Sequence, residues 1–130
     1  MLQSSPGLQR VVAAVAVLAC FSALFALCRA TDQRADRGRP MYRDVLTLAW
    51  AQYDRLRAGG QVLPSDLRAG DRLTDDDAAP VVSPGVRLRV VADGGGFCVR
   101  GWNQFGETTG WVCGDPSTKP PALGALTHLD

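Results

Sequence analysis

An uncharged, apolar run near the amino terminus, VVAAVAVLACFSALFALC from Val11 to Cys28, limits what this chain can fold into. As a helix rising about 1.5 Å per residue, the run would cross most of a bilayer core about 30 Å thick. We therefore predict a membrane or targeting segment in residues 1–30. The rest of the 130-residue chain can form at most one globular domain.

Three fates of this segment are compatible with the sequence. A retained membrane anchor fits its length, because the apolar regions of signal peptides usually stop at about 15 residues. A cleaved signal peptide fits Arg10, which supplies a basic start, and the small residues Cys28 and Ala30 at the positions that a signal peptidase reads. A lipoprotein fits the stretch from Val17 to Cys20, which is similar to a lipobox.

A charged stretch, residues 31–39, separates this segment from a predicted amphipathic helix. The stretch has no apolar periodicity, which indicates a linker or a solvated extension of a helix. Pro40 is a favourable first helical residue, and Gly59-Gly60 provides the glycine that a helix C-cap favours. Between them, steps of three and four predict one buried face, made of Tyr42, Val45, Leu46, Ala49, Tyr53 and Leu56.

Residues 61–84 are interrupted by three prolines and a glycine, which predicts a surface loop with at most one short helical turn near residues 65–68. Asp75, Asp76 and Asp77 lie together in this segment. An EF-hand-like calcium site needs alternating ligands, a glycine bend and a distal glutamate, which this segment lacks. We therefore expect a solvated acidic loop, and no metal or cofactor.

Three later runs have strand character, residues 86–92, 95–103 and 108–114. Asp93-Gly94 favours a two-residue turn between the first two runs, which would place Val90 opposite Phe97 and Leu88 opposite Val99. The resulting architecture is an α+β fold with an amphipathic helix packed on a small three-stranded antiparallel sheet.

The second and third runs are joined by a loop centred on Phe105-Gly106. This loop would place Trp102 opposite Thr109, Arg100 opposite Trp111, and Cys98 opposite Cys113. Directly opposed residues of antiparallel strands lie within reach of a disulfide, so we predict a cross-strand bond. Two unpaired buried thiols are the alternative. A zinc site is less favoured, because only His128 could join the two thiolates.

The cysteines also bear on orientation in the membrane. Five arginines follow the apolar run while Arg10 and the amino terminus precede it, so the positive-inside tendency places the carboxyl side in the cytoplasm. A disulfide argues for the opposite side, because such bonds persist in oxidising compartments. Giving the disulfide more weight, we predict a single-pass protein of the cell membrane with its C-terminal domain outside, or a secreted domain after cleavage near Ala30.

The predicted pairing also divides the sheet into two faces. The apolar side chains form the core face: Val86, Leu88, Val90, Phe97, Val99 and Val112, with Gly101 and Gly110 allowing close approach of the helix. The opposite face collects basic and aromatic residues: Arg87, Arg89, Arg100, Trp102 and Trp111. We consider it a candidate binding face, because tryptophan and arginine are enriched at interface hot spots. Ordinary surface packing by cation–π contacts is the alternative.

The net charge of the chain and its lack of a catalytic motif limit the functions that it could have. A formal net charge of +1 gives no bulk attraction to nucleic acid. The lone histidine, His128, lies in a Pro-rich tail, residues 116–130, with no nucleophile or carboxylate pair placed beside it. We therefore expect neither an enzyme nor a small-molecule substrate, and a tail that is flexible unless a partner docks it.

Two segments resemble actinobacterial type IV pilin-like and pseudopilin-like proteins: AWAQYDRLRAGGQVLPSDL, residues 49–67, and VSPGVRLRVVADGGGFCVRG, residues 82–101. This resemblance implies a pilin-like domain over residues 40–115, behind a membrane helix. It also implies a structural or interaction role in a surface or secretion apparatus, with protein partners of the envelope. The chain departs from prepilins after Gly7, because Val12 stands where they carry glutamate.

A second resemblance is carried by GETTGWVCGD, residues 106–115, which is similar to the end of bacterial SH3-type domains. It implies an anchored or secreted module that binds cell wall or a protein partner. A five-stranded barrel would then be expected.

Overall fold

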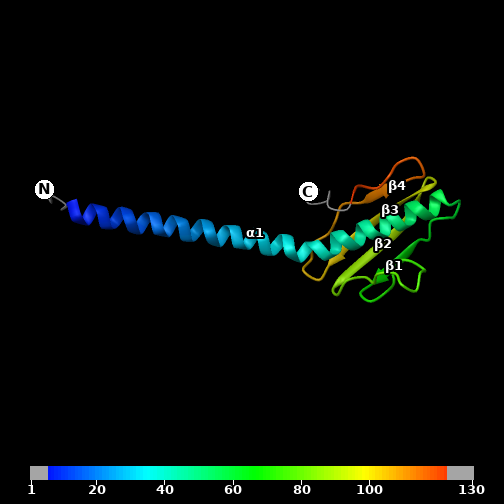
Figure 1. Ribbon diagram of the computed structural model, residues 1–130, viewed down its shortest axis with the longest axis horizontal. Helices are drawn as coiled ribbons and strands as arrows, with labels where there is room; N and C mark the ends of the chain where they lie inside the picture. The colour runs from blue at the N-terminus through cyan, green and yellow to red at the C-terminus, as the bar shows by residue number, and fades with distance from the viewer. Residues whose placement is uncertain (1–5, 123–130) are drawn as a thin grey trace. The chain divides into compact units, whose positions relative to one another are not determined.

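The computed structural model describes residues 6–122 and divides into two compact units, Met1–Ala35 and Asp36–Asp130. One helix and four strands follow one another along the chain (Figure 1): α1 (Pro6–Arg57), β1 (Ser65–Arg68), β2 (Val86–Asp93), β3 (Gly96–Asn103) and β4 (Val112–Gly114). The fold is α+β with an antiparallel sheet, as predicted. The sheet has four strands in the order β1-β2-β3-β4, however, and the prediction of three was wrong.

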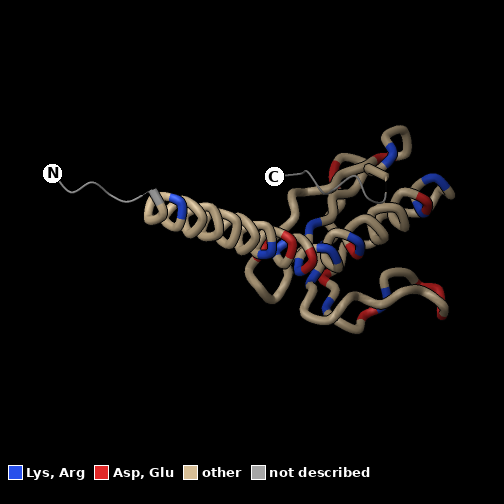
Figure 2. Tube along the Cα trace, turned by 60° about the vertical axis from the view of Figure 1, so that its left-hand side comes forward, with Lys and Arg blue, Asp and Glu red and all other residues tan. Residues whose placement is uncertain are grey.

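Within the first unit, α1 is long and apolar enough to cross a membrane, as a membrane anchor or a signal sequence would be. Its most apolar 18-residue window has a mean hydropathy of 2.7 and none of it is buried, and Figure 2 shows a long stretch of this helix without charged residues. The hydroxyls of Ser22 and Thr31 donate to the carbonyls of Leu18 (2.9 Å) and Cys28 (2.7 Å). The first of these bonds satisfies a hydroxyl within the apolar run, which hydrocarbon would not solvate.

The charged stretch is helical, so the prediction that a helix begins at Pro40 was wrong. Pro40 lies inside α1. Because proline has no N–H, the carbonyl of Asp36 loses its usual helical partner there. The preceding residues are mostly good helix formers, and Asp36 pairs with Arg39 one turn later at 3.2 Å. The alternative of a solvated helix extension is the one that the structure supports.

The end of α1 agrees with the predicted glycine cap. Gly59 has a φ of 81°, and the helix ends at Arg57. The amide of Gly60 donates to the carbonyl of Arg55 and that of Gly59 to Leu56, each at 3.0 Å. These two bonds form a Schellman motif, which satisfies carbonyls that the helix end leaves free.

Strand β1 lies where we predicted a loop with a helical turn, so that prediction was wrong. Its residues alternate between half-buried and exposed, with Ser65 and Leu67 turned towards the core. Leu67 is in register with Leu88 of β2. The segment that follows folds back as a hairpin, in which the amide of Gly70 donates to the carbonyl of Val82 at 3.0 Å. A strand of four residues gives too short a period-two pattern to be recognised against flanking proline and glycine.

The β2–β3 turn is one residue later than predicted. Gly94 and Gly95 occupy it with φ values of 51° and 89°, and Val90 is in register with Val99 rather than with Phe97. A turn with positive φ at both central residues is easier for two glycines than for Asp93 and Gly94. Because the register differs by two residues, every side chain keeps its predicted face.

Between β3 and β4, Cys98 is in register with Cys113, and the two form the predicted disulfide. The rest of the predicted pairing was wrong, since Trp102 bridges to Thr108 instead of Thr109, and Trp111 has no ladder partner among residues 6–122. The segment that leads into β4 has one more residue than the part of β3 that it faces. This bulge accounts for both differences. Thr109 compensates, because its side-chain oxygen accepts a hydrogen bond from the Gly101 amide at 2.9 Å.

The core lies between the sheet and the part of α1 in the second unit (Figure 1). All six residues of the predicted core face of the sheet are buried. On α1, Val45, Leu46, Ala49 and Tyr53 are buried as predicted, and Tyr42 and Leu56 are partly buried. The helix also buries Met41 and Leu48, which the predicted stripe omitted.

Gly101 marks the closest approach of α1 to the sheet. A Cβ atom there would lie 2.6 Å from Val45 Cγ2 and 3.0 Å from Met41 Cγ. We expect Gly101→Ala to lower the free energy of unfolding by about 1–3 kcal/mol, because the packed helix must shift. Gly110→Ala is the control, since no atom of the described residues, apart from those of its chain neighbours, lies within 4 Å of its added Cβ. The predicted close approach of the helix at Gly110 was therefore wrong. Equal urea midpoints for the two variants would contradict this packing.

The first part of the predicted flexible tail is held against α1. Pro120 is buried, and the Trp50 indole Nε1 donates to the carbonyl of Pro121 at 3.0 Å. The remainder of that tail, including His128, lies outside the described residues.

Candidate functional site

The sheet face turned away from α1 is the candidate site, and we call it the outer face. Because side chains alternate along a strand, it carries every second residue of the ladder. Its residues come from all four strands: Asp66, Arg68, Arg87, Arg89, Val91, Asp93, Cys98, Arg100, Trp102 and Cys113. The basic residues gather towards the end of the sheet remote from the disulfide, which we call the arginine half: Asp66, Arg68, Arg87, Arg89, Arg100 and Trp102.

The structure brings together all five residues of the predicted binding face. Arg87 and Arg89 are exposed, and they lie in register with Trp102 and Arg100, which are half-buried. Trp111 is 46% exposed and reaches the same region from the bulge before β4. It does so without the ladder pairing to Arg100 that we had predicted.

Arg100 connects the two tryptophans. Its guanidinium carbon lies 5.4 Å from the ring centroid of Trp102 and 5.9 Å from that of Trp111. The same guanidinium donates to the carbonyl of Thr109 (3.1 Å) and to the hydroxyl of Thr108 (3.0 Å). Cation–π contacts of this kind contribute about 0.5–1 kcal/mol at exposed sites. Arg100 therefore fixes the positions of both rings and of the bulge between them.

Asp66 and Arg89 form a bidentate ion pair across β1 and β2. Arg89 Nε donates to Asp66 Oδ1 at 2.7 Å and Nη2 to Oδ2 at 3.3 Å. The hydrogen bond from Arg89 holds the pKa of Asp66 below its ordinary value, and the charges of Arg89 and Arg68 lower this pKa further. Asp66 and Arg68 were missed in the sequence, because they lie in the segment that we had assigned to a loop.

The lowered pKa of Asp66 predicts a pH dependence of stability. A carboxyl whose pKa is lower in the folded state stabilises the fold above its unfolded pKa, and this contribution is lost as the pH falls through the folded pKa. We expect NMR titration of the Asp66 carboxyl carbon to give a midpoint below that of an unpaired aspartate. In Arg89→Met the midpoint should return towards the ordinary value. An unchanged midpoint in that variant would contradict the ion pair.

Arg68 and Arg87 are directly opposite each other on β1 and β2, and both are exposed. Neither forms an ion pair with any residue in the part of the chain that the structure describes. The arginine half thus holds four arginines against a single aspartate, which Arg89 already occupies. This is a local positive surplus that the net charge of +1 conceals.

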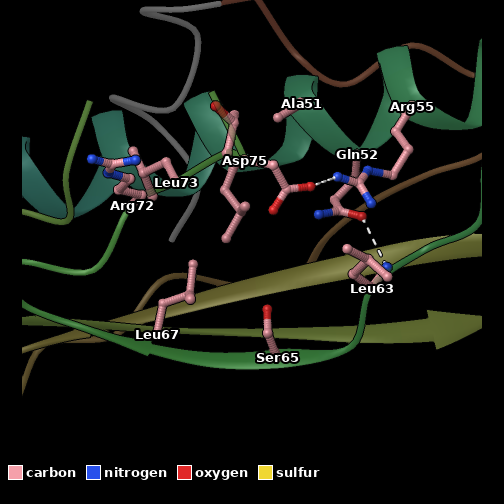
Figure 3. Close-up of a pocket in the computed structure, with 11 residues that line it drawn as sticks. Ala51, Gln52, Arg55, Leu63, Ser65, Leu67, Arg72, Leu73 and Asp75 are labelled. Carbon is pink, nitrogen blue, oxygen red and sulfur yellow. Dashed lines mark hydrogen bonds and ion pairs between the residues drawn. The ribbon is translucent and has the colours of Figure 1, made fainter. Parts of the chain in front are cut away.

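A cavity of about 190 Å³ lies elsewhere in the domain, between α1, β1 and the hairpin after β1 (Figure 3). Leucines line much of it, and the Gln52 side-chain oxygen accepts from the Leu63 amide at 3.3 Å. At its edge Arg55 forms an ion pair with Asp75. The predicted acidic loop is thus exposed but partly paired, since Asp77 also forms an ion pair with Arg72. Within residues 6–122, no group of three potential metal ligands comes together.

Comparisons of the chain with protein-family models, with curated proteins and with solved structures find no match. The chemistry of the site therefore has to be inferred from its own residues. Guanidinium groups recognise carboxylate and phosphate through paired hydrogen bonds, and indole rings supply flat apolar contact area. The arginine half is consequently suited to binding an anionic partner.

Proposed function

We propose that this protein is a non-enzymatic, pilin-like component of the cell envelope, anchored through residues 11–28. Its domain would lie outside the membrane as a structural or interaction component of a surface or secretion apparatus. The observation that carries the proposal is that α1 supplies both the apolar segment and the buried face that packs on an antiparallel sheet. The resemblance to type IV pilin-like proteins implies this use of one helix.

The disulfide supports the external location. Cys98 and Cys113 are bonded in the folded domain, whereas Cys20 and Cys28 are free thiols of the apolar segment. Structural disulfides persist in oxidising compartments and are rare in a reducing cytosol. We give this more weight than the arginines that follow the apolar segment, which favour the opposite orientation.

A binding role is supported by the outer face. Arginine and tryptophan are the residue types that carry most energy at binding interfaces, and here ring contacts hold them in place. The SH3-type alternative gains no comparable support, because the sheet of the described residues has four strands and α1 covers one face of it.

The location is tested by fusing reporters to the carboxyl terminus of the full chain in its host. We expect an alkaline phosphatase fusion to be active and to remain with the membrane fraction. A green fluorescent protein fusion exported by the same route should be dark. An inactive phosphatase fusion together with a fluorescent green fluorescent protein fusion would contradict the proposal.

Membership of a surface apparatus needs a separate test. We expect mechanical shearing of intact cells to release the protein together with other surface material. Deletion of residues 11–28 should abolish this recovery, since the anchor would be lost. Retention of the wild-type protein solely in the sheared cell bodies would argue against a surface apparatus.

A further inference from the structure

We propose that the arginine half of the outer face binds an acidic glycan, meaning a polymer of sugar rings that carry anionic groups. This inference rests on the proposed function in one respect, because the face must lie outside the membrane to meet such a polymer. It adds the chemical class of the partner, which that function leaves open.

The first argument is the excess positive charge at Arg68 and Arg87. Directly opposed residues of antiparallel strands have Cβ atoms about 4.5–5.5 Å apart, and like charges at that position are destabilising. Asp66 offsets this repulsion only in part: it attracts Arg68 electrostatically, but both of its oxygens accept hydrogen bonds from Arg89. A bound anion between the two guanidinium groups would remove this repulsion and gain charge-assisted hydrogen bonds.

The second argument is the aromatic ring beside them. Arg68 is in register with Arg87, and Arg87 with Trp102, so the three form a row across β1, β2 and β3. With neighbouring strands about 4.8 Å apart, the row extends about 10 Å across the sheet. Arg100 holds the ring of Trp102 in place. An indole beside two guanidinium groups matches a sugar unit, which presents an apolar C–H face next to its anionic group.

The third argument distinguishes a glycan from a protein partner. Arginine and tryptophan occur at protein interfaces, but they do so around a centre that is largely apolar. On the arginine half, by contrast, five of the six ladder residues are charged, and Trp102 is the single apolar one. The large aliphatic side chains of β2 are instead buried in the core. A hydrated polymer with repeated charges suits this face better than an apolar protein surface.

The test uses the full chain with its disulfide intact, in nanodiscs of phosphatidylcholine, and polygalacturonate as the probe. We expect biolayer interferometry to show binding that weakens as salt is raised, and no binding to neutral dextran. Arg87→Glu and, on another strand, Arg68→Glu should each weaken binding about tenfold or more. Arg57→Glu makes the same change of charge at the end of α1, and it should alter binding less than about twofold.

Other outcomes would overturn the proposal. Polyglutamate carries carboxylates without sugar rings, so equal or tighter binding of polyglutamate would indicate an acidic protein partner. Tighter binding of a single-stranded oligonucleotide would indicate a nucleic acid. Equal loss in Arg57→Glu and Arg87→Glu would show that bulk charge, not this face, is responsible. If polygalacturonate does not bind while the phosphatase fusion is active, the proposal of a glycan partner is wrong and the proposed location stands.

Discussion

Asp44→Ala is expected to lower the free energy of unfolding by about 3 kcal/mol. Asp44 is 2% exposed, and its carboxylate accepts hydrogen bonds from the backbone amide of Ser83 (2.6 Å) and from its hydroxyl (3.1 Å). Arg43 adds a bond of 2.9 Å to the Ser83 hydroxyl. Alanine would leave the Ser83 amide buried without an acceptor and would disconnect α1 from the segment that leads into β2.

Two matched variants separate the loss of the Asp44–Ser83 hydrogen bonds from general effects on the helix. Asp44→Asn keeps an oxygen acceptor and should cost less than alanine. Asp54→Ala changes an exposed aspartate of the same helix and should stay within about 0.5 kcal/mol of the wild type. Urea unfolding of the detergent-solubilised protein, followed by tryptophan fluorescence, measures all three. If the Asp44 and Asp54 alanine variants were equally stable, the carboxylate would not be holding the two segments together.

The double variant Cys98→Ala/Cys113→Ala is expected to lose about 3 kcal/mol, because the bond closes a loop over a sequence separation of 15. In the chain-entropy account, removing it frees the unfolded chain and so favours unfolding. Strand β4 has only three residues, and within the described part of the chain it pairs only with β3. It should therefore be the first strand to lose protection from hydrogen exchange.

The second pair of cysteines provides the control for this prediction. Cys20→Ala/Cys28→Ala should leave the unfolding of the domain unchanged, since both thiols are free and exposed on the apolar segment. Reductant should bring the wild type to the stability of the Cys98/Cys113 variant and should not affect that variant further. A wild type that is equally stable with and without reductant would contradict a stabilising disulfide.

The features that sequence reasoning recovered are those governed by local chemistry. The apolar segment, the glycine cap after Arg57 and the core face of β2 and β3 all follow from periodicity and from the conformational needs of glycine. The disulfide was also predicted, although the loop at Phe105-Gly106 does not set its register alone, because the bulge before β4 is what brings Cys113 opposite Cys98. The two-residue error in the β2–β3 register did no harm to the faces, since side chains on a strand repeat every two residues.

The features that were missed depend on contacts between distant segments. Strand β1 exists because it pairs with β2, and neither Ser65 nor Leu67 signals that pairing alone. The continuous helix through Pro40 was missed because the residue's preference for the first turn was given more weight than the flanking helix formers. The bulge at Gly110 and Trp111 depends on Thr109 bonding the Gly101 amide, which no sequence pattern reports.

For the candidate site, the four residues on β2 and β3 were predictable from alternation, whereas Asp66 and Arg68 were not. Trp111 was predicted on the same face, but it reaches that face from the bulge and not through the predicted pairing. The omission of Asp66 and Arg68 hid the most informative feature of the face: Arg68 and Arg87, which form no ion pair with the described residues, lie beside the Asp66–Arg89 ion pair. Net charge gave no hint of it, because the opposite charges of the chain lie in other segments.

The central claim, a domain whose sheet is oxidised outside the cytoplasm, is tested most directly by alkylating thiols in the host's own membranes. Protein trapped at once with one alkylating reagent, then reduced and treated with a second, is digested and analysed by mass spectrometry. The peptides that contain Cys98 and Cys113 should carry only the second reagent. If both cysteines carry the first reagent, the bond is absent in the cell and the proposed external location is contradicted.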